Sequence, residues 1–82
     1  MENSIRILKV LEKIYEAKSK IELKRLELLV NTSLFNIEND EPLWGLELLD
    51  LLKKMKNENK ILQDAKNKYS ITEEGLEYLN NN

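Results

Sequence analysis

The sequence predicts a small, mainly α (α+β) domain with the element order helix, helix, helix, β-hairpin, helix. Three observations predict this order. A helical period runs through residues 4–17, two later segments carry helix start and stop signals, and two short apolar segments flank a polar loop within residues 60–71. Because 82 residues is a length typical of one domain, we expect a single domain over 1–82.

The first helix is expected over residues 4–17, where apolar side chains occupy one half of the helical circle. That face is wide for one small core. It fits either a central helix packed on two sides or a helix that also contacts a second chain. In the second case we expect a homodimer, with these contact residues: Ile5, Ile7, Val10 and Ile14, helped by Leu28 of the second helix.

The second helix is expected over residues 20–30, because the segment from Ser19 to Glu22 has the form of a capping box. Asn31 is a plausible left-handed residue to end it. Residues 31–40 are rich in Asn, Asp, Ser and Thr and predict a connecting segment. Its apolar residues are expected to anchor it to the core: Leu34, Phe35 and Ile37.

The third helix is expected over residues 42–56, where acidic residues and Pro42 resemble a helix start. Its period predicts a core stripe of Trp44, Leu48, Leu51, Leu52 and Met55. The opposite face would hold Leu43, Leu46, Glu47, Asp50, Lys53 and Lys54. On this pattern Trp44 packs in the core, and the alternative is a stacking platform for a ligand.

A hairpin is expected over about 60–71, with strands 60–63 and 68–71 joined by a loop of residues 64–67. A last helix would follow over 72–79. Thr72 is the natural N-cap, although Ser70 with Glu73 would also form a capping box. Gly75 lies inside this helix, where a missing side chain allows the helix to approach the hairpin closely.

The stretches "LLKKMKNENKI" and "YSITEEGLEYL", with a lysine-rich hairpin between them, resemble winged helix–turn–helix domains. They look most like the small archaeal and bacterial regulators of the PadR and MarR kind, and the resemblance covers Leu48–Leu79. It implies a two-stranded wing after three helices, and a third helix that lies near the major groove of DNA. Many winged helices share the "ITEEG" element regardless of ligand, so it specifies the fold better than the function.

The net charge is −2, but one segment is locally cationic. We therefore expect a transcriptional regulator that binds duplex DNA through lysine–phosphate contacts. The expected contact residues are Lys53, Lys54, Lys56, Lys60, Lys66 and Lys68. A solvated lysine face and an acidic protein partner are the alternatives for the same residues.

The exposed front of the third helix departs from the pattern of a base-reading helix. It offers Leu43, Leu46, Glu47 and Asp50, and none of these side chains donates a hydrogen bond to a guanine edge. An apolar stripe edged by charge is instead typical of a protein-binding surface. The alternative function is therefore a winged-helix module that binds a protein through this acidic, leucine-bearing face.

The composition argues against catalysis and against metal or cofactor binding. The chain has no Cys and no His, so it lacks thiolate and imidazole ligands and the commonest general base. Adjacent Glu73 and Glu74 diverge by about 100° on a helix and suit its N-terminus better than an acid–base pair. No apolar run reaches the ~18 residues of a membrane span. We expect a cytoplasmic protein that is not an enzyme, has no cofactor and has no membrane partner.

Overall fold

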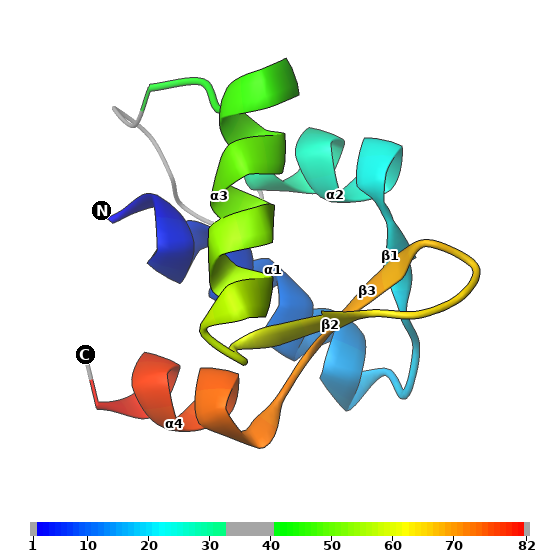
Figure 1. The fold of residues 1–82 in the computed structure, drawn as a ribbon, viewed down its shortest axis with the longest axis vertical. Helices are drawn as coiled ribbons and strands as arrows, with labels where there is room; N and C mark the ends of the chain where they lie inside the picture. The colour runs from blue at the N-terminus through cyan, green and yellow to red at the C-terminus, as the bar shows by residue number, and fades with distance from the viewer. Residues whose placement is uncertain (1, 33–40, 82) are drawn as a thin grey trace.

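The computed structural model describes residues 2–32 and 41–81, in which four helices and a three-stranded antiparallel sheet form an α+β fold (Figure 1). The elements are α1 (Asn3–Glu16), β1 (Ile21–Glu22), α2 (Leu23–Val30), α3 (Gly45–Asn57), β2 (Ile61–Gln63), β3 (Lys68–Ile71) and α4 (Glu73–Asn80). The expected fold class is confirmed at this level. The expected core anchors Leu34, Phe35 and Ile37 lie outside the described residues.

The sheet has three strands where the sequence predicted two. Its order is β1-β3-β2, with β3 in the centre. The short strand β1 places Ile21 opposite Tyr69, and both side chains are buried. On the other face of the sheet Glu22 lies opposite Lys68, a cross-strand pair of opposite charges. The expected capping box is therefore wrong, because the segment pairs with β3 and α2 begins only at Leu23.

The helices α1 and α3 end in the same way. Lys18 and Asn59 both have a positive φ, of 56° and 60°. The next residue in each case donates a backbone hydrogen bond back across the last turn, from Ser19 N to Ile14 O and from Lys60 N to Met55 O. This is the Schellman arrangement, which satisfies carbonyls left free at a helix end. The expected left-handed stop at Asn31 is wrong, because its φ is −103°.

The start of α3 differs from the prediction. The helix begins at Gly45, whose φ is +58°, so Pro42 lies before it. Trp44 is extended and 49% exposed, whereas Leu43 is 1% exposed. The sequence predicted Trp44 in the core and Leu43 on the opposite face, and the structure shows the reverse. Both residues precede the helix, so its period does not determine where their side chains lie.

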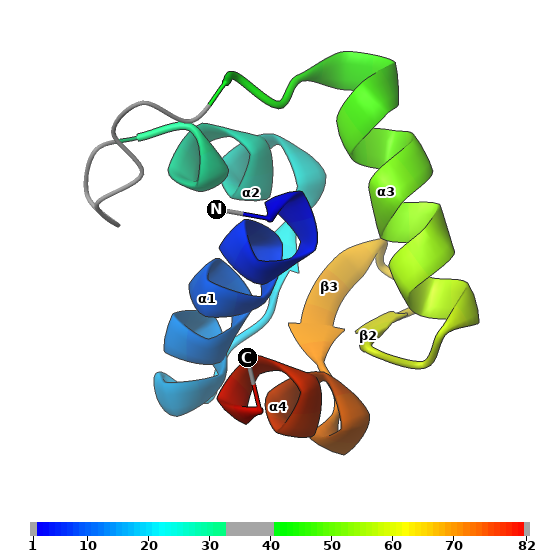
Figure 2. The ribbon, with the colours of Figure 1, turned by 90° about the vertical axis from the view of Figure 1, so that its left-hand side faces the viewer.

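The core forms where α1 meets α2, α4 and β3, as two views show (Figures 1 and 2). Its buried apolar residues are Ile7, Leu8, Val10, Leu11, Ile21, Leu26, Val30, Leu43, Leu48, Leu52, Met55, Ile61, Tyr69 and Ile71. Ile7, Val10 and Leu43 were expected at a partner interface. Their burial corrects that expectation, because these side chains already pack within the monomer.

The helix α4 begins as predicted. Thr72 is its N-cap, with Oγ1 accepting from Gly75 N at 2.9 Å. Gly75 is buried, and a Cβ built on it would lie 2.1 Å from Lys60 O. The glycine therefore allows α4 to lie directly against the start of β2, as its position in the sequence suggested.

Candidate nucleic-acid interface

The turn between β2 and β3, residues 64–67, is held by one carboxylate. Asp64 Oδ1 accepts from Lys66 N at 2.9 Å and from Lys68 N at 3.0 Å. Asn67 follows with a φ of 62°, and its N–H donates to Asp64 O. These bonds favour the charged carboxylate: the Lys68 N–H, with smaller contributions from Lys66 and Lys20, lowers the pKa of Asp64 from 3.8. The turn therefore has a fixed shape, and the side chains of Lys66 and Lys68 are exposed on it.

A further lysine reaches this turn from β1. Lys20 Nζ lies 3.3 Å from Asp64 Oδ2, although the two residues are far apart in the sequence. The contact exists because β1 pairs with β3 and brings the end of the α1–β1 turn to the hairpin. Sequence reasoning missed Lys20 since it missed β1. The sequence alternates polar Lys20, apolar Ile21 and polar Glu22, but this pattern is too short to specify a strand by itself.

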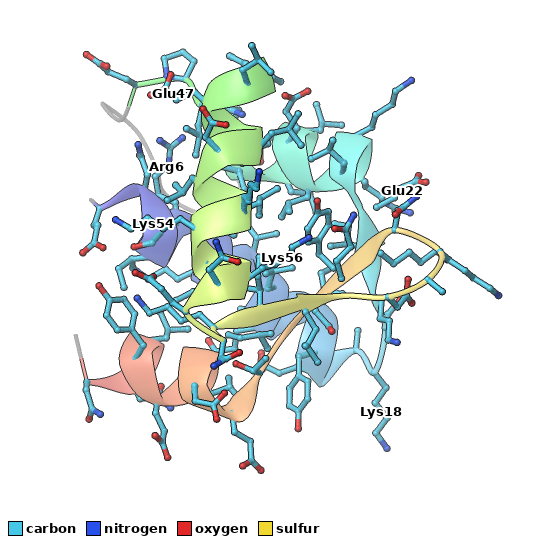
Figure 3. The ribbon with its side chains drawn as sticks, viewed as in Figure 1. Arg6, Lys18, Glu22, Glu47, Lys54 and Lys56 are labelled. Atoms are coloured by element: carbon cyan, nitrogen blue, oxygen red, sulfur yellow. The ribbon has the colours of Figure 1, made fainter. Side chains whose placement is uncertain are left out.

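The two flanks of α3 differ in charge. Glu47, Asp50 and Lys54 line a cavity of about 610 Å³ beside the first residues of α1. On the other flank, Lys56 Nζ donates to Gln63 Oε1 of β2 at 2.7 Å. Figure 3 shows Glu47 and Lys54 on the side of α3 where Arg6 lies, and Lys56 on the side of the hairpin. The acidic side chains of α3 thus lie away from the lysines of the hairpin turn.

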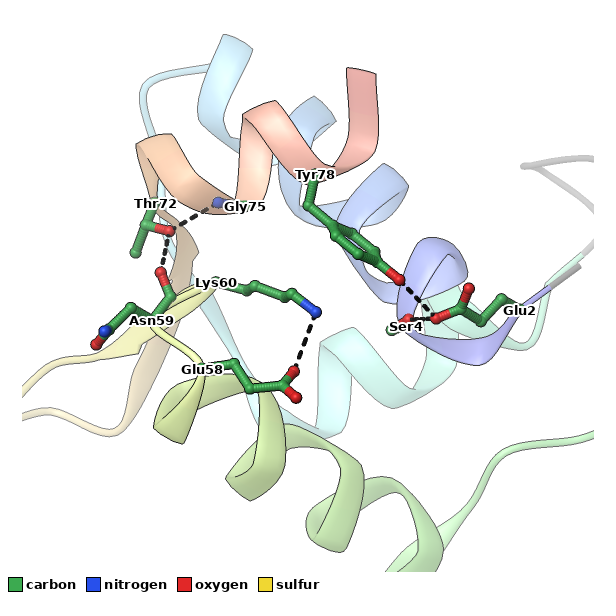
Figure 4. A network of polar contacts seen from close by, with 8 residues as sticks. All are labelled: Glu2, Ser4, Glu58, Asn59, Lys60, Thr72, Gly75 and Tyr78. Carbon is green, nitrogen blue, oxygen red and sulfur yellow. Dashed lines mark hydrogen bonds and ion pairs between the residues drawn. The ribbon is translucent and has the colours of Figure 1, made fainter. Parts of the chain in front are cut away.

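Lys60 is occupied by contacts within the molecule (Figure 4). Its Nζ lies 3.0 Å from Glu58 Oε1 and 3.7 Å from the centre of the Tyr78 ring. The Tyr78 hydroxyl in turn donates to Glu2 Oε1 at 3.0 Å. Hydrogen bonds from Ser4 and from Tyr78 lower the pKa of Glu2. Lys60 therefore joins the end of α3 to α4, and Lys54 lies on the acidic flank, so these two expected contact residues do not join the others.

The front of α3 is fixed by side chains of α1 and α2. Glu27 Oε2 accepts from Gly45 N at 2.7 Å, at the point where the helix begins. Asn31 exchanges two hydrogen bonds with the backbone of Leu43, of 2.7 and 2.9 Å. Arg6 is 2% exposed and donates to Glu41 O at 2.8 Å and to Val30 O at 3.2 Å. These bonds set where α3 starts and how it is oriented.

Of the other four expected lysines, Lys66 and Lys68 are exposed on the hairpin turn, Lys53 is exposed on α3, and Lys56 is half-buried beside β2. The chain matches no protein-family model, no curated protein and no solved structure. The function of this surface is therefore argued from its geometry and charge.

Large apolar side chains are also exposed near this surface. Leu46 is 77% exposed on α3, and Leu49 and Trp44 are partly exposed beside it, as is Leu28 on α2. Leu46 and Leu28 were expected at a partner interface, and their exposure leaves them accessible for one. Ile5 and Ile14, from the same expectation, are half-buried on α1.

Within residues 2–32 and 41–81, no group of three or more acidic, His or Cys side chains could hold a metal ion. In the same residues no helix has the length and apolar character needed to cross a membrane.

Proposed function

We propose that the chain is a winged-helix DNA-binding protein, a transcriptional regulator that contacts duplex DNA through lysine–phosphate pairs. The element order and the sheet order β1-β3-β2 support this arrangement, with β2, β3 and their turn as the wing and α3 as the helix beside it. The central placement of β3 gives the wing a third strand for support, since a two-stranded hairpin alone is marginally stable.

The observation that carries the proposal is the separation of charge on α3. Lys53 is exposed three residues before Lys56 and three after Asp50, so it lies between them on the helix surface, and Lys56 is on the side that meets β2. Lys66 and Lys68 extend this positive surface along the hairpin turn. Phosphates that approach from this side meet four lysines, while Glu47 lies on the opposite flank of α3.

The contacts supply attraction without sequence selectivity. Lysine ammonium groups pair with phosphates as point charges, and the leucines at the front of α3 offer no hydrogen bond to a base edge. If four lysines each neutralise a phosphate, log affinity falls with log salt concentration with a slope of about −3.6 per chain.

The test is fluorescence anisotropy of a labelled random-sequence duplex, titrated with the protein at several salt concentrations. Lys66→Ala should reduce the salt slope by about one unit. Lys9→Ala removes the same charge from an exposed position of α1 and is the matched control, which should leave the slope unchanged. Absence of binding at low salt, or equal effects of the two variants, would refute DNA binding through this surface.

A second candidate function is favoured by the exposure of Leu46, Trp44 and Leu49 around the start of α3. An apolar patch edged by Glu47 and Asp50 suits a protein partner, or a second copy of this chain in a homodimer. Leu46→Arg separates the two functions. It should abolish partner binding or self-association, measured by light scattering, while it leaves or strengthens the affinity for DNA.

A further inference from the structure

A second cavity lies on the other side of the molecule from the acidic flank of α3, between the end of α1 and β3. Its volume is about 520 Å³, within the range of small-molecule sites. The lining residues are Tyr15, Glu16, Lys18, Ser19, Lys20, Ser70 and Ile71. The lining does not include the four lysines that we propose for contact with DNA, which are Lys53, Lys56, Lys66 and Lys68.

The walls of this cavity are mainly apolar. Tyr15 is exposed by 55% at the end of α1, an unusual placement for a large aromatic side chain. Ser70 and Ile71 line the cavity on the side of β3; Ile71 is 5% exposed, and Ser70 lies on the sheet face opposite buried Tyr69. An aromatic ring, an aliphatic side chain and one hydroxyl form a site for an apolar body with few polar groups.

The rim of the cavity is cationic. Lys18 lies in the turn that ends α1 and has a left-handed backbone conformation. Figure 3 shows its side chain extending from this turn. Lys20 follows two residues later and uses one contact, with Asp64. The ammonium group of each lysine has three donors, so Lys20 retains donors for a second acceptor.

The charges around the rim favour a monoanion over a more highly charged ligand. Glu16 also lines the cavity and would repel an anion, but its carboxylate is paired with Lys13 Nζ at 3.5 Å. The carbonyl groups at the end of α1, which would repel an anion as well, accept backbone hydrogen bonds from Ala17, Lys18 and Ser19. The charged lining residues Lys18, Lys20 and Glu16 sum to a formal charge of +1, which matches one carboxylate and not a phosphate with two charges.

We propose that this cavity binds a small carboxylic acid with an apolar body. The carboxylate lies between Lys18 and Lys20, and the body packs against Tyr15 and Ile71. Because Lys20 also contacts Asp64, the bound carboxylate shares that ammonium group with the aspartate. Occupancy of the cavity is thereby sensed at the hairpin turn, where Asp64 holds the Lys68 N–H.

The test uses the full chain labelled with ¹⁵N and titrated with octanoate or 2-naphthoate, with octanamide and 2-naphthamide as neutral counterparts. The two acids distinguish an aliphatic from an aromatic body. The expected result is saturable shifts of the Tyr15, Ser70 and Lys68 amide signals on one binding curve for at least one acid, and at least tenfold weaker binding of its amide. Neither acid requires DNA, so the result is independent of the proposed DNA function.

Two variants locate the site. Lys18→Ala should weaken carboxylate binding roughly fivefold, the size of a charge-assisted contact at an exposed position, whereas Lys9→Ala on the exposed side of α1 should not change it. Ser70→Ile adds a side chain suited to a strand and fills the cavity, so it should abolish binding while the far-UV circular dichroism stays native. The proposal is overturned by shifts that do not saturate, by equal binding of acid and amide, or by equal effects of the two lysine variants.

Discussion

Gly75→Ala tests the close approach of α4 to the hairpin. The new Cβ would lie 2.1 Å from Lys60 O and 2.8 Å from Ile71 Cγ1. The carbonyl oxygen is part of the backbone and accepts from Thr72 N at 3.1 Å, so it cannot rotate away. Relief therefore requires α4 to move by about 1 Å, since nonbonded atoms prefer separations above ~3 Å.

The magnitude follows from three effects. Overpacking of this kind costs about 1–3 kcal/mol, and displacement of Gly75 N from Thr72 Oγ1 weakens an N-cap worth about 1 kcal/mol. Alanine favours a helix over glycine by about 1 kcal/mol, which offsets part of this loss. We expect a net loss of about 1–3 kcal/mol in the free energy of unfolding, and a fall in Tm of about 4–24 °C.

The assay is urea denaturation followed by far-UV circular dichroism, with Gly45→Ala as the control. No atom lies within 4 Å of a Cβ built on Gly45, so that change has only the cost of a left-handed φ, about 1 kcal/mol. Steric contact predicts that Gly75→Ala is the more damaging of the two. If Gly75→Ala were as stable as the unmodified protein, helix propensity alone would decide the outcome and the packing argument would be refuted.

Three other changes test the bonds that place α3 and the hairpin turn. Arg6→Met should lower the free energy of unfolding in urea by about 3 kcal/mol, because it removes the donors to Glu41 O and Val30 O. Glu27→Ala should lower it by about 1 kcal/mol and speed hydrogen exchange in the first turn of α3, since Gly45 N loses its acceptor. The pKa of Asp64 is lowered in the folded state, so its contribution to stability is present above its unfolded pKa and is lost as the pH falls through the lower folded value. Acid titration by NMR should show that carboxyl titrating below 3.8, together with the Lys68 amide signal; titration at or above 3.8 would contradict the hydrogen bonds of the turn.

The elements that sequence analysis placed correctly depend on nearby residues. Thr72 caps α4 with a bond to a residue three positions later, and the hairpin turn depends on Asp64 and its next four residues. Their signals are local, and they were readable in the sequence. The strand β1 was missed because its two residues are stabilised by Tyr69 and Lys68, far along the chain. No local pattern of two residues specifies such a strand.

The start of α3 could not be predicted for a similar reason. Pro42 has the right composition for a first turn, but the acceptor for the helix start comes from Glu27 on α2. The bonds of Asn31 hold the backbone of buried Leu43, Trp44 is extended, and the helix begins only at Gly45. The expected phase put Trp44 in the core and Leu43 outside, and the shift in start reverses both. Interactions across the tertiary structure determined this boundary, as they often do.

The charged side chains of α3 are distributed over two of its sides. Glu47 and Asp50 were expected at the front of the helix, where they would repel phosphates from the surface that a DNA duplex would approach. In the structure both line the cavity next to α1, and Lys56 extends toward β2 instead. The numbers of acidic residues and lysines in the sequence are the same for the expected and the observed arrangement. If the proposed DNA contact is correct, these carboxylates would lie to one side of the lysine surface, and Leu46 would offer no hydrogen bond to a base edge. The proposed function then predicts attraction to phosphate without base recognition, which would be measured as a steep salt dependence with little dependence on DNA sequence.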